Sequence, residues 1–155
     1  MKTPSLAIGQ LFKYTAIIMC INLACNNGTK NFHMESFVVD THNDILLRSM
    51  LGRDILTDLP ESHSDLIKFK KGGMDLQVFS IWVSPYLFAN DESFEEANNM
   101  IDELEAQCLR VPDQWSIPMN YQDIIYNEQH NILSCMIGVE GGHAIENDLS
   151  KLNTL

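Results

Sequence analysis

Three apolar runs at wide intervals along the chain limit its fold more than any other feature. Residues Phe37–Thr41, Leu76–Val83 and Ile132–Val139 have the length and the β-branched or aromatic content of buried strands. Helix-like stretches separate these runs. Strands that alternate with helices, and that are apolar enough to be covered on both faces, are typical of a parallel α/β sheet. The pattern leaves open whether the sheet closes into a barrel.

The intervening segments carry helix start and stop signals. The clearest helix is predicted to start at Ser93, which has capping-box spacing to Glu96, and to end before Pro112. Shorter elements are expected at Ile45–Leu51 (a helix or a turn), at Ser64–Lys71, and at Asn120–Glu128 with Asn120 as the cap. Leu149, Leu152 and Leu155 predict the beginning of another helical face.

The first 24 residues have the pattern of an export signal. The apolar stretch Tyr14–Ala24 follows two lysines and is too short for a membrane span, which needs roughly 20 residues. Small residues before Cys25 and a polar tract after it resemble a bacterial lipoprotein signal with Cys25 acylated; an ordinary secretory signal is the alternative. We expect a signal peptide at 1–24, a flexible tether at 25–35 and a domain at 36–155, in an exported protein anchored by lipid to the cell envelope.

The composition fits one domain and excludes one class of partner. The chain has 155 residues, 45% of them hydrophobic, which is enough for a core. Its formal charge of −11 comes without a stripe of Lys or Arg, so nucleic-acid binding is not expected. Cys108 and Cys135 lie at apolar positions and are expected to be buried thiols. The sequence leaves a disulfide between them open.

Ligand-type side chains follow two of the three apolar runs. Positions i and i+2 of a strand face the same way, so His42 and Asp44 are expected to project together. Glu140 directly follows the third run, and in parallel α/β folds functional side chains gather at the carboxyl ends of strands. Imidazole and carboxylate groups can hold zinc. By themselves the same residues also fit a solvated loop and a helix cap.

Four segments together resemble the membrane (renal-type) dipeptidases, in the family's order and at about its spacing. They are Val39–Asp44, the stretch from His63 through Asp65 to Gly73, Gln77–Val83 and Ile137–Ile145. The last, Ile-Gly-Val-Glu-Gly-Gly-His-Ala-Ile, is the most specific.

The resemblance implies a fold and an activity. The family fold is a (β/α)₈ barrel of the TIM type with two zinc ions at the carboxyl ends of its strands, and its activity is dipeptide hydrolysis by a hydroxide held between the metals. It implies that His42 and Asp44 ligate one zinc, and that Glu140 bridges both and is the catalytic residue. It also implies a dipeptide substrate and a possible homodimer of the complete enzyme.

The remaining histidines and aromatic residues are given other roles. We expect a loop or helix-capping role for His63 and Asp65, and a place beside the bridging glutamate for His143. His33 and His130 are expected to be solvated, and Phe79 and Trp82 to pack the barrel.

The chain is short for this family. A (β/α)₈ barrel takes roughly 250 residues, whereas Cys25–Leu155 offers 131. In the family, two histidines from later strands complete the second zinc site, and later residues clamp the substrate carboxylate. We therefore expect the N-terminal half of a longer enzyme, inactive by itself. One alternative is a non-catalytic scaffold that acts as a binding or interaction module. Another is a barrel metallohydrolase of the amidohydrolase kind, although Asp44 stands where that class has a second histidine.

Overall fold

The computed structural model describes residues 32–88 and 92–155. The chain divides into two units, Met1–Ser36 and Phe37–Leu155. In the described part of the first unit, a turn is closed by the Ser36 hydroxyl, which donates to the carbonyl of Phe32 at 2.5 Å. The predicted signal peptide and Cys25 lie outside the described residues.

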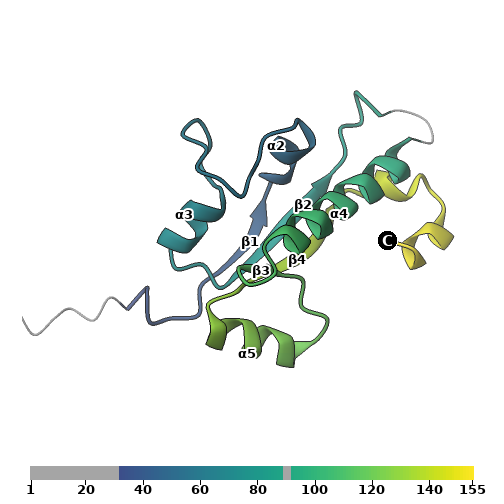
Figure 1. Cartoon of the computed structure of the whole chain (residues 1–155). Coiled ribbons are helices and arrows are strands. Elements are labelled where there is room, and N and C mark those ends of the chain that lie inside the picture. Colours follow the sequence, from purple (N-terminus) through teal and green to yellow (C-terminus); the bar gives the residue numbers. More distant parts are fainter. Residues whose placement is uncertain (1–31, 89–91) are drawn as a thin grey trace, which may run out of the picture. The chain divides into compact units, whose positions relative to one another are not determined.

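A sheet of four parallel strands forms the centre of the second unit (Figure 1). The strands are β1 (Val39–Asn43), β2 (Leu76–Trp82), β3 (Trp115–Ser116) and β4 (Leu133–Glu140), in the order β1-β2-β4-β3. The parallel sheet predicted from the sequence is confirmed. The short strand β3 was missed, because two residues provide no periodicity.

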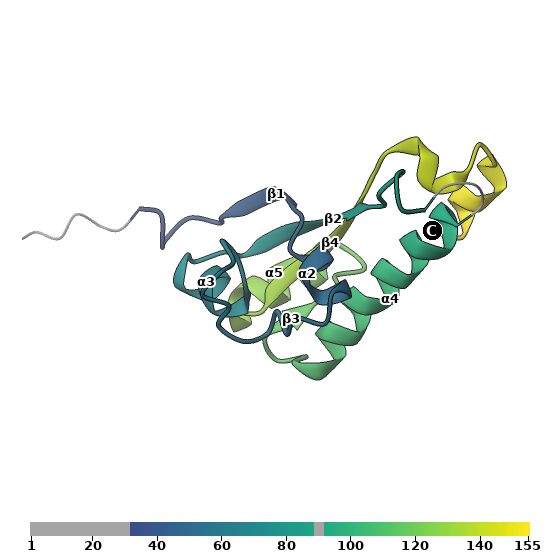
Figure 2. The ribbon, with the colours of Figure 1, turned by 90° about the horizontal axis from the view of Figure 1, so that it is seen from above.

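Helices α2 (Leu46–Met50), α3 (Leu66–Lys71) and α4 (Ser93–Arg110) lie on one side of the strands (Figure 2). A further helix of the described residues, α5 (Tyr121–His130), connects β3 to β4. Asn120 caps α5 as predicted, since its side chain accepts from the N–H of Asp123 at 3.1 Å. Within the described residues, no helix combines the length and the apolar character that crossing a bilayer requires.

The core lies between the sheet and the helices α2, α3 and α4. Phe79 of β2 is fully buried, with its ring 5.3 Å from that of Trp115 and 6.2 Å from that of Phe69. Phe79 therefore packs as predicted, whereas Trp82 is only partly buried. Burying each such large side chain contributes about 1.5–3 kcal/mol, so this aromatic cluster holds α3 and β3 against β2.

The predicted capping box at the start of α4 is wrong. Ser93 is already the first residue of the helix, and its hydroxyl donates to the carbonyl of Phe88 at 3.0 Å. A carboxylate from a distant segment takes the capping role instead: Glu146 accepts from the N–H of Phe94 at 2.9 Å and pairs with Lys151. Local spacing cannot reveal a partner 52 residues away.

The helix expected near the C-terminal end of the sequence is replaced by two 3₁₀ helices, η1 (Gly142–Ile145) and η2 (Leu149–Asn153). Between them Glu146 and Asn147 have positive φ angles of 53° and 61°, which an α-helix cannot contain. Leu149 and Leu152 are largely exposed, so they do not form a buried helical face.

Cys108 of α4 and Cys135 of β4 are both buried free thiols, as expected. Burial raises the pKa of the Cys135 thiol, and a hydrogen bond from this thiol lowers the pKa of Cys108.

Asp65 anchors the start of α3. Its buried carboxylate accepts from the N–H groups of Lys68 at 2.8 Å and Leu59 at 2.9 Å, and pairs with the Lys68 ammonium. Burial alone would raise the pKa of this carboxyl, but the bonds from Lys68 and from the two backbone groups outweigh it, so the pKa is lowered. The capping role expected for this segment therefore belongs to Asp65.

We predict that Asp65→Ala lowers the free energy of unfolding by about 1–3 kcal/mol, because it removes a cap and leaves the Leu59 N–H unpaired. Since the folded-state pKa is depressed, this stabilisation is present above the unfolded pKa of about 3.9 and is lost as the pH falls through the folded value. Urea titrations of the unaltered chain and of Asp65→Ala, at pH 7 and at successively lower pH, would measure how the difference in free energy of unfolding declines.

The matched control is Asp58→Ala, which removes the exposed carboxylate that contacts the same Lys68 at 3.3 Å. We expect Asp58→Ala to be nearly neutral. Equal destabilisation by the two variants would contradict the special role of Asp65.

Candidate metal centre

An irregularity in β1 places His42. Val39 and Asp40 pair with Leu76 and Gln77, but Asn43 then pairs with Phe79, so β1 carries one more residue than β2 over this interval. Such a bulge bends the strand and redirects its side chains. The N–H of His42 donates to the Asp40 carboxylate at 3.2 Å within the bulge.

His42 and Asp44 project together as predicted, with His42 Nε2 3.4 Å from Asp44 Oδ1, although the bulge interrupts the regular strand alternation from which this was expected. Asp44 lies just beyond the end of β1, where the side chain of Asn43 holds the turn. The Asn43 side-chain oxygen accepts from the N–H of Ile45 at 3.0 Å and from the Ser64 hydroxyl at 3.1 Å. Ile45 is buried in the core, so the turn that presents Asp44 is fixed on both sides.

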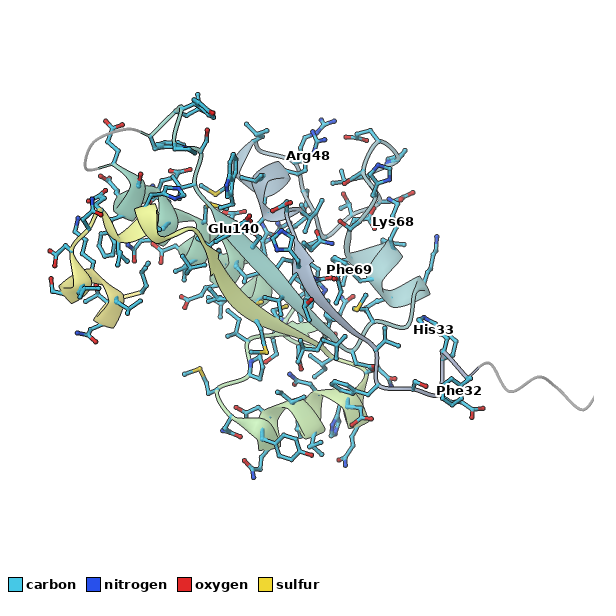
Figure 3. The ribbon with its side chains drawn as sticks, turned by 180° about the vertical axis from the view of Figure 1, so that it is seen from behind. Phe32, His33, Arg48, Lys68, Phe69 and Glu140 are labelled. Carbon is cyan, nitrogen blue, oxygen red and sulfur yellow. The ribbon has the colours of Figure 1, made fainter. Side chains whose placement is uncertain are left out.

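Glu140 is the last residue of β4 (Figure 3), and in the register of the sheet it pairs with Trp82. One oxygen of its carboxylate, Oε2, accepts from the hydroxyl of Ser80 at 2.9 Å. The chain then turns sharply at Gly141, whose φ is +95°. Beyond the turn, the Nε2–H of His143 donates to the carbonyl of Val83 at 2.8 Å, which ties η1 to the end of β2.

Three ligand-type side chains meet at this edge of the sheet. Nε2 of His42 lies 3.4 Å from Oδ1 of Asp44 and 3.6 Å from Oε2 of Glu140. One ligand atom from each of the three residues lies within 4.8 Å of the others. Each side chain is about half exposed, at 55% for His42, 54% for Asp44 and 49% for Glu140. The cluster is therefore open to solvent and to solutes.

The distances within the cluster suit a shared cation. They exceed the 2.7–3.2 Å of an ordinary N–H···O hydrogen bond. Two ligands at about 2.05 Å from a tetrahedral zinc ion are about 3.3 Å apart, close to the values for His42. A cation here would also neutralise the repulsion between the carboxylates of Asp44 and Glu140. In the part of the chain that the structure describes, no other set of three such residues is gathered in this way.

A hollow of about 360 Å³ adjoins the cluster. His63 lines it together with His42 and Asp44, but does not belong to the three-residue cluster. Arg48, on the last turn of α2 (Figure 3), also lines this hollow. The sequence singled out His63 as a loop residue and gave no role to Arg48.

Two other histidines are exposed, as the sequence predicts. His130 is the last residue of α5, and its ring stacks on that of Tyr126 with 3.9 Å between the ring centroids. His33 is exposed. Sequence reasoning missed Ser80, for which the available signal was a polar residue inside the apolar run Leu76–Val83.

The fold and this site define an α/β protein with a candidate metal centre at the carboxyl ends of parallel strands. The model of the membrane dipeptidase family, peptidase family M19, matches residues 27–155. The chain belongs to that family, as the resemblance implied.

Two curated relatives are similar to this chain. Dipeptidase ataJ of Aspergillus terreus is 24% identical over 131 residues, which cover 76% of this chain and 32% of that protein. Dipeptidase 3 of Mus musculus is 27% identical over 123 residues, which cover 76% of this chain and 24% of that protein. The chain thus spans about a third of the length of the first relative and about a quarter of the second.

Two solved structures share the fold. A crystal structure described as dipeptidase AC, a metallo peptidase of family M19, superposes with a TM-score of 0.65 at 24% identity, covering 76% of this chain and 39% of that one. The probable dipeptidase PvdM of Pseudomonas aeruginosa superposes with a TM-score of 0.63 at 18% identity, covering 79% of this chain and 32% of that one. The predicted fold class, an α/β protein of the (β/α)₈ type with part of the barrel present, is confirmed.

We predict that Gly141→Ala lowers the free energy of unfolding by about 1–3 kcal/mol, because a side chain is strained at this φ. A Cβ built there lies 2.5 Å from the ring of His143, so the ring has to move and its bond to Val83 is lost. Chemical denaturation would measure the change.

Gly142→Ala is the matched control, since a Cβ there meets nothing within 4 Å. A loss of stability in Gly142→Ala as large as that in Gly141→Ala would show that the strain at Gly141 is not the cause.

Proposed function

We propose that His42, Asp44 and Glu140 bind zinc, and that the chain supplies this part of the site of a zinc-dependent dipeptidase. The observation that carries the proposal is the spacing of the three donors, with His42 Nε2 at 3.4 Å and 3.6 Å from the two carboxylate oxygens. Membership of the membrane dipeptidase family supports the same function.

The donor set fits zinc by its chemistry. Zinc accepts imidazole nitrogen and carboxylate oxygen, and catalytic zinc sites keep a position open beside three protein ligands. All three side chains are about half exposed, which leaves room for that position. When bound, zinc polarises a carbonyl oxygen and lowers the pKa of a bound water molecule to about 7, which makes hydrolysis feasible near neutral pH.

The residues of this chain would contribute positioning and charge. His42 and Asp44 would hold one ion from the end of β1, while Glu140 would face both that ion and the second one that the family uses. The resemblance assigns the remaining ligands of the second ion, two histidines, to later strands of the complete barrel. The hollow lined by Arg48 and His63 adjoins His42 and Asp44, so it is the natural place for part of a dipeptide substrate.

We extend the proposal to the location and assembly of the protein. The apolar stretch Tyr14–Ala24 and the polar tract after Cys25 support export, removal of residues 1–24 and a lipid anchor on Cys25. Residues 25–35 would then form a tether and 36–155 the dipeptidase domain. The family resemblance supports a homodimer of the complete enzyme.

We predict that the purified chain binds zinc, and that His42→Ala, Asp44→Ala and Glu140→Gln each weaken binding by more than about tenfold. Loss of a group that only orients a ligand already costs about 10–100-fold in metal affinity, and loss of a ligand should cost at least as much. Isothermal titration calorimetry with zinc at pH 7 would provide the dissociation constants.

His130→Ala and Glu128→Gln are suitable controls, because both side chains are exposed on α5 and outside the cluster. Equal zinc affinity in the site variants and in these controls would reject the proposed ligand set.

We also predict that the 155-residue chain alone hydrolyses a dipeptide of the Gly–D-Ala type no faster than background. The reason is that the proposed second zinc lacks its histidine ligands here. The measurement is release of free D-alanine with zinc present. Turnover that Glu140→Gln abolishes would contradict the view of an incomplete site. If the chain shows no zinc binding and no turnover, the result would instead favour a non-catalytic scaffold.

A further inference from the structure

We infer that Ser80 is a positioning residue that sets the orientation of Glu140 for metal binding. This inference rests on the proposed function and extends it by one residue, Ser80, which is not one of the predicted ligands. Ser80 comes from β2, so the metal centre would draw on three strands of the sheet rather than two.

The contact between the two residues is direct. The Ser80 hydroxyl donates to Oε2 of Glu140 at 2.9 Å. The same oxygen lies 3.6 Å from Nε2 of His42. The hydrogen bond therefore acts on the carboxylate oxygen that faces the other donors. A carboxylate oxygen has two lone pairs, so Oε2 can accept from Ser80 and still bind a cation.

The sheet register makes this contact possible. Ser80 pairs with Gly138, and Glu140 lies two residues further along β4, so Glu140 projects from the same face of the sheet as Gly138. Gly138 has no side chain there. Ser80 itself is only 2% exposed, whereas Glu140 is half exposed. A fixed, buried hydroxyl thus holds one end of a long side chain that would otherwise sample several rotamers at the rim.

The physical consequence is preorganisation. A free glutamate side chain at the surface has to be ordered when a cation binds, and that ordering weakens the apparent affinity. If Ser80 orders Glu140 beforehand, loss of the hydroxyl should weaken zinc binding without removing any ligand. Outer partners of metal ligands typically contribute about 10–100-fold to affinity.

The test is the zinc affinity of Ser80→Ala, measured by calorimetry on the full chain. We expect the dissociation constant to rise about 10-fold or more, with a circular dichroism spectrum like that of the unaltered chain. Ser134→Ala is the matched control. Ser134 is also fully buried, and its hydroxyl accepts from Asn127 at 3.0 Å, at the opposite end of β4. Its zinc affinity should be unchanged.

A double-mutant cycle separates positioning from a general structural effect. If Ser80 acts through Glu140, adding Ser80→Ala to Glu140→Gln should weaken zinc binding no further. Equal affinity of Ser80→Ala and the unaltered chain, or full additivity of the two substitutions, would overturn the role of Ser80 while leaving the ligand set intact. Failure of the unaltered chain to bind zinc would overturn the proposed function, and the role of Ser80 with it.

Discussion

The parallel pairing of β2 with β4 is the constraint on which the rest of the structure depends. It runs residue by residue from Leu76 opposite Ser134 to Trp82 opposite Glu140, so the two strands end at the same level. β1 joins β2 on its other side. Side chains separated by almost a hundred residues in the sequence are thereby carried to one edge, where the short connections after each strand can present them together.

Electrostatics gives this edge its chemical character. Asp44 and Glu140 place two carboxylates beside one imidazole, in a chain whose formal charge is already −11. The single imidazole, even when protonated, would balance only one of the two carboxylates. The distances around His42 match those between ligands of a common ion better than those of a hydrogen bond. Charge and spacing thus favour the same explanation.

The precision of the site comes from groups that are not ligands. The bulge in β1, the side-chain bonds of Asn43, the turn at Gly141 and the hydroxyl of Ser80 each fix one part of the geometry. They are distributed over β1, β2 and the segment after β4. The site is therefore a property of the assembled sheet, and none of these segments would hold it alone.

The amino-acid sequence by itself determined the fold class, most element positions and the three candidate ligands, because apolar periodicity and residues at strand ends are local features. Their positions at strand ends made His42, Asp44 and Glu140 candidates, the resemblance to the membrane dipeptidases implied their role as ligands, and Asn120 could be recognised as a cap. Only the tertiary structure decided how they are held. The one-residue register shift in β1, the cap supplied to α4 by Glu146, and the bond from Ser80 to Glu140 all depend on partners that are distant in the chain. The physical reason is that periodicity describes which face a residue takes, whereas the contacts on that face are set by how neighbouring strands and helices pack.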